Sequence, residues 1–206
     1  LKSACRDVLL LPDHLHVAVN LSMIQILNDD ITGLVTETLR ETGLSPGRLK
    51  LEITESVFMQ NVEVVSGVLS NLQALGVCIS LDDFGTGFSS LSLLRMFPFD
   101  KIKIDKSFVQ EMEHSGECLA IVQSVIGLGR SLGMRTTAEG VETERMAELL
   151  ISEGCTELQG YLYGCARPAS ELVKSGVLSW KKQIPASAVE EDVPVPAETP
   201  RLRRVV

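Results

Sequence analysis

Two adjacent aspartates, Asp82 and Asp83, follow an apolar run and precede the glycine-rich residues 84–88. Neighbouring anions repel each other, so a cation is expected beside them. In an extended strand the two side chains would face opposite sides, but at a strand end the chain bends and both carboxylates can reach hard cations. One of them could then bridge two metal ions, as in two-metal hydrolases. A surface turn capped by an Asp side chain is the alternative for this pair taken alone.

Three more polar residues interrupt or end apolar runs of strand type. Glu52 lies within such a run, where a carboxylate is costly unless a metal ion or a basic group neutralises it. Asn20 offers a neutral oxygen ligand, although an asparagine at a strand end is also a common turn former. Lys103 offers an ammonium that can hold an attacking water and offset charge on a phosphoryl group. An ion pair with an acidic residue is its structural alternative.

Later runs of the same type are followed by Glu139, Glu142 and Gln159, which add two carboxylates and an amide. Residues 83–85 read Asp-Phe-Gly, as in protein kinases, but the chain has no glycine-rich nucleotide loop before them and no His-Arg-Asp catalytic loop. The three histidines fit no ligand spacing. The chemistry indicated is therefore metal-assisted, with oxygen ligands.

These polar residues share one position, at or near the carboxyl end of a strand-type run. The runs expected to form strands are residues 16–21, 49–54, 78–82, 101–105, 135–139 and 157–160. Stretches of helical period separate them. Four of these stretches stop at a glycine suited to the left-handed position after a helix, namely Gly43, Gly76, Gly133 and Gly154. Alternating strands and helices of this kind predict a parallel sheet.

A closed barrel explains the polar strand ends better than an open doubly wound sheet, because only a barrel gathers every strand end into one ring. We therefore expect an α/β fold, a TIM-like (β/α) barrel. A closed eight-stranded barrel takes about 250 residues, and only about six strands are expected here, so the barrel should be incomplete. Residues 1–11 have helical character, which suggests that two opening strands precede Leu1.

Composition limits the alternatives. The chain has 206 residues and a net charge of −8, which argues against a polynucleotide partner. Charged residues interrupt every apolar stretch before it reaches the roughly 20 residues of a membrane span. Five scattered cysteines suggest neither a disulfide framework nor a thiolate zinc site. We expect a cytoplasmic domain over residues 1–178 and a disordered tail over residues 179–206, where four of the eight prolines lie.

Six motifs follow one another along the chain, at residues 19–22, 52–56, 82–91, 103–109, 138–143 and 159–161. As a set they resemble the EAL domain family of cyclic di-GMP phosphodiesterases, and the resemblance covers residues 1–178. It implies a TIM-like barrel that hydrolyses one phosphodiester of cyclic di-GMP to give linear pGpG, using two Mg²⁺ or Mn²⁺ ions. Such cations would also allow an acidic pocket to accept an anionic substrate.

The resemblance implies a role for each matching residue. Asn20, Glu52 and Asp82 correspond to ligands of the first metal ion. Asp82, Asp83 and Glu139 correspond to ligands of the second, so Glu139 also belongs to the catalytic set.

Four further residues match family residues that contact the attacking water, steady a loop or lie near the substrate. Lys103 corresponds to the lysine that holds the attacking water, and Gln159 corresponds to an amide near that water. Glu55 resembles the glutamate that steadies the loop after the paired aspartates. Glu142 resembles a supporting acid near the substrate.

The Glu-Ala-Leu tripeptide that names the family does not occur in the sequence. Its glutamate corresponds to a ligand of the first metal ion. We therefore expect the tripeptide to lie in the opening strands and this chain alone to be poorly active or inactive. A module that binds cyclic di-GMP or another protein without turnover is the main alternative. A Schiff-base enzyme built on Lys103 is another, but it leaves the acidic ring unexplained.

The same resemblance implies partners. We expect cyclic di-GMP as the ligand and sensory or GGDEF-type domains fused upstream, in a protein that could be anchored in a membrane elsewhere. We also expect a homodimer that pairs through residues 84–95, although burial of this segment within one barrel explains its apolar side chains almost as well.

Overall fold

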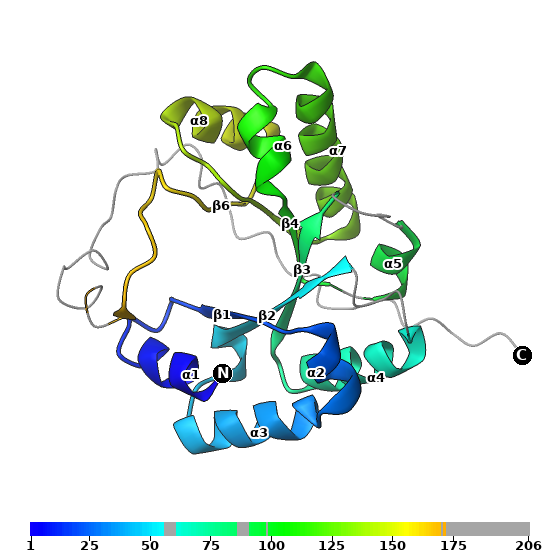
Figure 1. Ribbon diagram of the computed structural model, residues 1–206, viewed down its shortest axis with the longest axis vertical. Coiled ribbons are helices and arrows are strands. Elements are labelled where there is room, and N and C mark those ends of the chain that lie inside the picture. Colours follow the sequence, from blue (N-terminus) through cyan, green and yellow to red (C-terminus); the bar gives the residue numbers. More distant parts are fainter. Residues whose placement is uncertain (56–60, 86–90, 98, 170, 172–206) are drawn as a thin grey trace, which may run out of the picture.

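The computed structural model describes residues 1–55, 61–85, 91–97, 99–169 and 171. Six strands lie in consecutive order across one curved sheet (Figure 1). They are β1 (Val17–Asn20), β2 (Leu49–Thr54), β3 (Cys78–Phe84), β4 (Lys101–Ile104), β5 (Arg135–Ala138) and β6 (Glu157–Leu158). All neighbours are parallel, so the carboxyl ends of the strands form one rim.

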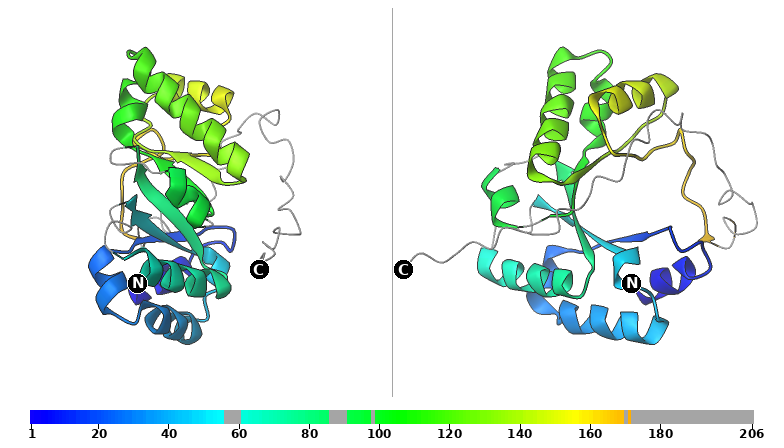
Figure 2. Two further views of the ribbon diagram at one scale, coloured as in Figure 1. Left: turned by 90° about the vertical axis from the view of Figure 1, so that its right-hand side faces the viewer. Right: turned by 180° about the vertical axis from the view of Figure 1, so that it is seen from behind.

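Helices connect the strands and lie outside the curve of the sheet (Figures 1 and 2). They are α1 (Lys2–Val8), α2 (Met23–Asn28), α3 (Ile31–Thr42), α4 (Val62–Ala74), α5 (Leu91–Met96), α6 (Lys106–Glu111), α7 (Gly116–Leu132) and α8 (Glu144–Glu153), with a 3₁₀-helix, η1 (Pro46–Arg48). In the part of the chain that the structure describes, no helix has both the length and the apolar character to cross a membrane.

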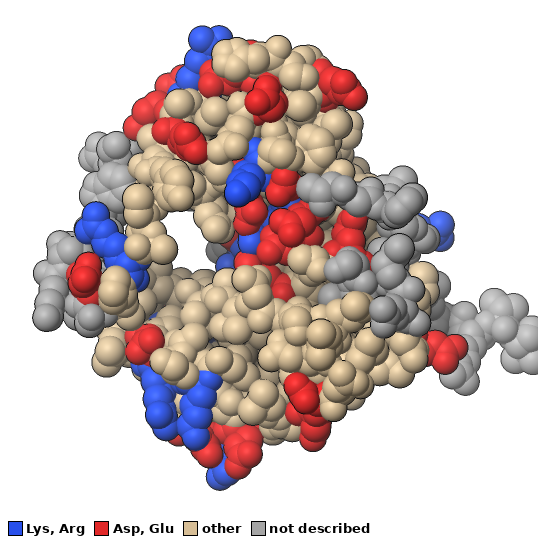
Figure 3. All heavy atoms as spheres, in the orientation of Figure 1, with Lys and Arg blue, Asp and Glu red and all other residues tan. Residues whose placement is uncertain are grey.

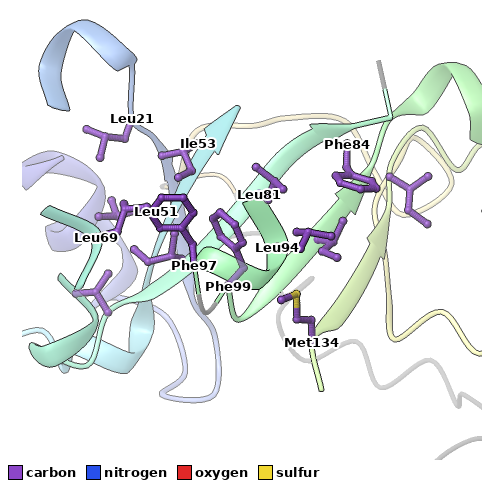
Figure 4. Packing of buried hydrophobic residues seen from close by; sticks show 14 of the residues in the cluster. Leu21, Leu51, Ile53, Leu69, Leu81, Phe84, Leu94, Phe97, Phe99 and Met134 are labelled. Atoms are coloured by element: carbon purple, nitrogen blue, oxygen red, sulfur yellow. The ribbon is translucent and has the colours of Figure 1, made fainter. Parts of the chain in front are cut away.

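Strand β2 shows how the sequence assigns the two faces of the sheet. Leu51 and Ile53 are buried and belong to the same apolar cluster as Leu69 of α4 (Figure 4). Lys50 and Glu52 alternate with them and are less buried. Because side chains along a strand point alternately to opposite faces, Lys50 and Glu52 lie on the inner face, away from the helices.

The predicted strands all form, with differences at their ends. β1, β5 and β6 are one or two residues shorter than predicted, and α1 ends at Val8 rather than at residue 11. β4 stops before Asp105, because this side chain instead caps α6 and accepts a hydrogen bond from the backbone N–H of Ser107 at 2.9 Å. β3 continues to Phe84 through a register shift. The four predicted glycines all have positive φ, as expected after helices.

β1 and β6 form the two edges of the described sheet. The segment after β6, drawn in yellow, leads from the β6 side of the sheet toward α1 (Figures 1 and 2). The predicted incomplete TIM-like barrel is thus confirmed as a half-barrel of six parallel strands with helices outside it. The predicted tail, residues 179–206, lies outside the described residues.

Candidate functional site

The inner face of the half-barrel brings carboxylates from three strand ends to one lysine. Glu52 extends from β2 and Asp82 from β3, while Glu139 directly follows β5. Lys103 of β4 places its Nζ 2.9 Å from both Glu52 Oε2 and Asp82 Oδ1. The same Nζ lies 2.6 Å from Glu139 Oε1. The side chain of Lys103 is only 5% exposed, so these ion pairs are largely shielded from water.

A bend after Leu81 turns Asp83 toward the same group. Asp83 has a φ of 53°, which is uncommon for a residue other than glycine, and the β3–β4 register shifts between Leu81 and Phe84. Asp82 Oδ1 accepts a hydrogen bond from the backbone N–H of Asp83 at 3.1 Å. Carboxylate oxygens of Asp82, Asp83 and Glu139 lie within 4.8 Å of one another. The paired aspartates therefore reach one side, as predicted for a strand end.

Close packing after β5 positions Glu139. Its backbone N–H donates a hydrogen bond to the carbonyl oxygen of Ile104 at 3.1 Å, which continues the pairing of β5 with β4. The next residue, Gly140, has a φ of 71°, and a Cβ at this position would lie 2.6 Å from the Cβ of Lys106. A glycine is required to make this turn without displacing α6, so the turn fixes Glu139 at the rim.

Burial and mutual repulsion act on the acidic side chains of this group. Burial raises the pKa of Glu139, and the negative charges of Asp82 and Glu52 raise it further. The ammonium of Lys103 lowers this pKa but does not cancel the increase. Burial and Asp82 likewise raise the pKa of Asp83. Burial by itself would lower the pKa of Lys103, but hydrogen bonds to its three carboxylate partners raise that pKa well above its usual value. Lys103 is therefore held as an ammonium ion.

Asn20 and Gln159 come from the two edges of the sheet. Asn20 ends β1 in register with Glu52 of β2, which places both residues at the same level of the sheet. Gln159 follows β6, and its backbone N–H donates a hydrogen bond to the carbonyl oxygen of Ala138 at 2.8 Å. A cavity of about 130 Å³ is lined by residues that include Glu52, Lys103 and Gln159. Gln159 thus faces the same space as the lysine.

Glu55 and Glu142, the other predicted site residues, have different surroundings. Glu55 directly follows β2 and is partly buried, next to residues 56–60, which lie outside the described part of the chain. Glu142 is exposed, and its Oε1 accepts a hydrogen bond from Gln110 Nε2 at 2.9 Å. This bond ties Glu142 to α6. The functional roles of both residues stay predictions.

A second charged group on the inner face lies nearer the amino ends of the strands, and sequence reasoning missed it. Glu157 of β6 forms ion pairs with Lys101 of β4, Lys50 of β2 and Arg135 of β5. Burial lowers the pKa of Lys101, and although burial also opposes ionisation of Glu157, the surrounding cations lower the pKa of that carboxyl. The alternation in residues 101–104 could have revealed this group, because it puts Lys101 on the same face as Lys103.

The carboxylate group at the rim suits a hard divalent cation. Figure 3 shows acidic side chains gathered at the centre of the face in view, with basic side chains among them. Carboxylate and amide oxygens are the ligands that Mg²⁺, Mn²⁺ and Ca²⁺ prefer. Lys103 supplies one positive charge to the four carboxylates of Glu52, Asp82, Asp83 and Glu139, so the group retains an excess of negative charge. The donor set and the charge both fit the predicted metal ions.

The sequence of the chain matches a protein-family model and several known proteins. The model of the EAL domain family matches residues 1–168. MucR of Pseudomonas aeruginosa, a bifunctional diguanylate cyclase/cyclic di-GMP phosphodiesterase, is 42% identical over 179 residues. That match covers 85% of this chain and 26% of MucR, so the chain spans about a quarter of this relative's length.

Solved structures show the same fold. The PaMucR phosphodiesterase in a complex with c-di-GMP superposes with a TM-score of 0.79 at 40% identity, over 83% of this chain and 71% of that chain. BlrP1 of Klebsiella pneumoniae in a manganese/cyclic di-GMP complex at pH 6 gives a TM-score of 0.72 at 35% identity, over 78% of this chain and 42% of that chain. The half-barrel is therefore shared with proteins that bind this nucleotide.

Proposed function

The chain belongs to the EAL domain family, and from that premise we propose that it hydrolyses cyclic di-GMP to linear pGpG. The observation that carries the proposal is the close approach of Asp82, Asp83 and Glu139, whose carboxylate oxygens lie within 4.8 Å of one another. Both structural relatives hold cyclic di-GMP, and one of them also holds manganese. An acidic rim accepts a substrate with two phosphodiester anions only when cations intervene.

We assign two divalent cations, Mg²⁺ or Mn²⁺, to the rim. Asn20, Glu52 and Asp82 would hold the first ion. Asp82, Asp83 and Glu139 would hold the second, so that Asp82 is shared. When bound, such ions lower the pKa of water and stabilise the attacking and leaving oxygens of an in-line displacement. The register of Asn20 with Glu52 and the bend at Asp83 support this division.

The protein's own groups hold and orient the reactants. The ammonium of Lys103 holds the attacking water and offsets negative charge that develops on the phosphoryl group. Gln159, which lines the same cavity as Lys103, orients that water. Glu55 steadies the segment after the paired aspartates. Glu142, which accepts a hydrogen bond from Gln110 of α6, supports the substrate.

The proposal also covers the extent of the domain, the domains that accompany it and its pairing. Residues 1–178 form the catalytic domain, and residues 179–206 form a tail. Because MucR combines a diguanylate cyclase with a phosphodiesterase, sensory or GGDEF-type domains would accompany this domain, which would itself lie in the cytoplasm. Two copies would pair through residues 84–95, of which residues 86–90 lie outside the described ranges and Leu94 is buried in the core.

A binding module without turnover is the second candidate function. It would apply to a protein without the glutamate of the Glu-Ala-Leu tripeptide, which corresponds to a ligand of the first metal ion in the family. The retained carboxylates favour the enzyme, because a pure nucleotide-binding site has no need for closely spaced acidic groups that repel an anionic ligand.

Chromatographic detection of pGpG tests the proposal. Cyclic di-GMP and Mg²⁺ are added to the 206-residue chain and to the same chain extended by a Glu-Ala-Leu-containing opening segment from a family member. We expect the extended form to release pGpG and the shorter form to be at least about 10–100-fold slower, the cost of a lost group at a metal site. An extended form that folds and binds cyclic di-GMP without releasing pGpG would contradict the enzyme and support the binding module.

A further inference from the structure

Lys103 uses its full hydrogen-bonding capacity on the rim carboxylates. An ammonium group has three N–H donors, and Lys103 Nζ meets three acceptors, one each from Glu52, Asp82 and Glu139. The distances, 2.9, 2.9 and 2.6 Å, are those of charge-assisted hydrogen bonds. In this arrangement Lys103 has no donor left for a water or a phosphate.

The burial of this group makes Lys103 the counter-ion of the acidic rim. The lysine side chain is 5% exposed, and its partners Glu52, Asp82 and Glu139 are 14%, 13% and 17% exposed. Water screens such charges poorly, so their repulsion must be offset within the protein. Lys103 provides that offset from the centre of the group.

The same three carboxylates are ligands in the proposed metal site. A divalent cation that binds between Glu52 and Asp82 would approach the oxygens that Lys103 now contacts, and two cations a few ångströms apart in a shielded site repel strongly. The ammonium and the metal ion therefore compete for one set of oxygens. We propose that Lys103 occupies the cation-free site as a built-in counter-ion and that divalent cations bind by displacing its ammonium from Glu52 and Asp82. This inference rests on the proposed function.

Displacement would also prepare Lys103 for its role in the reaction. The four-carbon stem of a lysine is flexible, so the ammonium can move while the strand stays in place. Once its carboxylate partners are taken, the released ammonium has donors for the attacking water and the phosphoryl oxygens. The exchange thus couples metal loading to the presentation of Lys103, and it keeps the lysine away from substrate until the site is loaded.

The chain offers a matched control on the same strand. Lys101 lies two residues before Lys103 on the same inner face, and its side chain is 9% exposed. It pairs with Glu157, on β6, instead of with the rim carboxylates. Lys101→Met therefore removes the same charge from the same strand without removing the proposed competitor.

The experiment measures Mn²⁺ affinity by calorimetric titration of the 206-residue protein and of its Lys103→Met, Lys103→Arg and Lys101→Met variants. We expect Lys103→Met to bind Mn²⁺ about tenfold tighter or more, because it removes a positive charge from the centre of the site. Lys103→Arg keeps the charge and should bind no tighter than the unchanged protein. Lys101→Met should stay within about threefold of the unchanged protein, because its charge lies outside the carboxylate group.

Melting curves without metal provide a second readout. Lys103→Met should melt at a lower temperature than the unchanged protein without metal, because its carboxylates lose their counter-ion, and Mn²⁺ should raise its melting temperature by a larger amount. If the unchanged protein binds Mn²⁺ and Lys103→Met binds it equally or more weakly, the proposed displacement of the Lys103 ammonium is wrong, but the proposed metal site is not. No Mn²⁺ binding by any of the four proteins would instead overturn the proposed metal site.

Discussion

Lys103 at the rim and Glu157 nearer the amino ends of the strands are each held as an ion by oppositely charged neighbours. At the rim, Lys103 compensates carboxylates, whereas nearer the amino ends of the strands Glu157 compensates cations. Buried charges of this kind are tolerated only in partnership, since removing one partner leaves the others unpaired away from water. Each group should therefore respond to substitution of the residue at its centre.

Glu157→Gln tests the group nearer the amino ends. Because the pKa of Glu157 is lowered in the folded protein, its ionised form stabilises the fold at pH values above the ordinary glutamate range, and this stabilisation is lost as pH falls through the lowered pKa. We expect the variant to lose about 1–3 kcal/mol at pH 7, less than for a fully buried pair because Glu157 is 33% exposed.

The measurement is urea unfolding of both proteins between pH 7 and pH 3. The difference in unfolding free energy should be constant down to about pH 5 and should shrink below that, as the carboxyl of the unchanged protein becomes protonated. A difference that is absent at pH 7, or that grows on acidification, would show that the three cations do not depend on Glu157.

At the scale of elements, the strand ends and the turns after them aim the side chains. The register of β1, β2 and β3 fixes the levels of Asn20 and Glu52, and the bend in β3 turns Asp83 toward Asp82. The turn after β5 depends on Gly140 and its contact with α6. These connections position the rim carboxylates. A substitution in one turn should therefore change metal binding even though no proposed metal-ligating residue is replaced.

Gly140→Ala tests that turn. The added Cβ would meet the Cβ of Lys106 at 2.6 Å and its Cα at 3.3 Å, and the φ of 71° is strained for alanine. We expect a stability loss of about 1–3 kcal/mol and weaker Mn²⁺ binding, because Glu139 precedes the displaced residue.

Gly127→Ala is the matched control, because Gly127 lies within α7 and its added Cβ would meet nothing within 4 Å. It should be neutral or stabilise the protein by up to about 1 kcal/mol. Urea unfolding and Mn²⁺ titration measure both effects. Unchanged stability and Mn²⁺ affinity in Gly140→Ala would show that the turn does not position Glu139.

Local patterns in the sequence were sufficient to predict the six strands and the four helices that a glycine follows, but not α2, α5 or α6. Apolar runs ending in Asn20, Glu52, Asp82, Lys103 or Glu139 marked the strands and the rim, and the glycines marked the helix ends. Side-chain pairing could not be predicted in the same way. Whether Lys103 meets Glu52, Asp82 or Glu139 depends on the relative register and twist of β2 to β5, which are properties of the assembled sheet.

The sequence also did not show which residue at the end of a strand instead belongs to the connection that follows it. Asp105 was assigned to the strand on alternation alone, yet its side chain caps α6. The cation cluster around Glu157 escaped notice because its members come from four strands distant in sequence. A local pattern shows the face of each residue but not its neighbours across the barrel.

At the scale of the whole molecule, the half-barrel separates charge along its strands. The amino half of the inner face has more cations than carboxylates, and the carboxyl half has more carboxylates than cations. The helices cover the outer face, so both groups are confined to the inner one. In the proposed function, this excess negative charge attracts divalent cations to the end of the half-barrel where barrel enzymes place their active sites.

We propose that one carboxylate, Asp82, is shared by two divalent cations at this rim. Counting the Mn²⁺ ions bound at saturation, by electron paramagnetic resonance of the free ion, tests it most directly. We predict two bound ions for the unchanged protein and none for Asp82→Asn. Asp100→Asn is the control and should bind two ions. Asp100 directly precedes β4, and its carboxylate accepts a hydrogen bond from the backbone N–H of Ile79. Two ions retained by a folded Asp82→Asn variant, or none bound by the unchanged protein, would contradict the account.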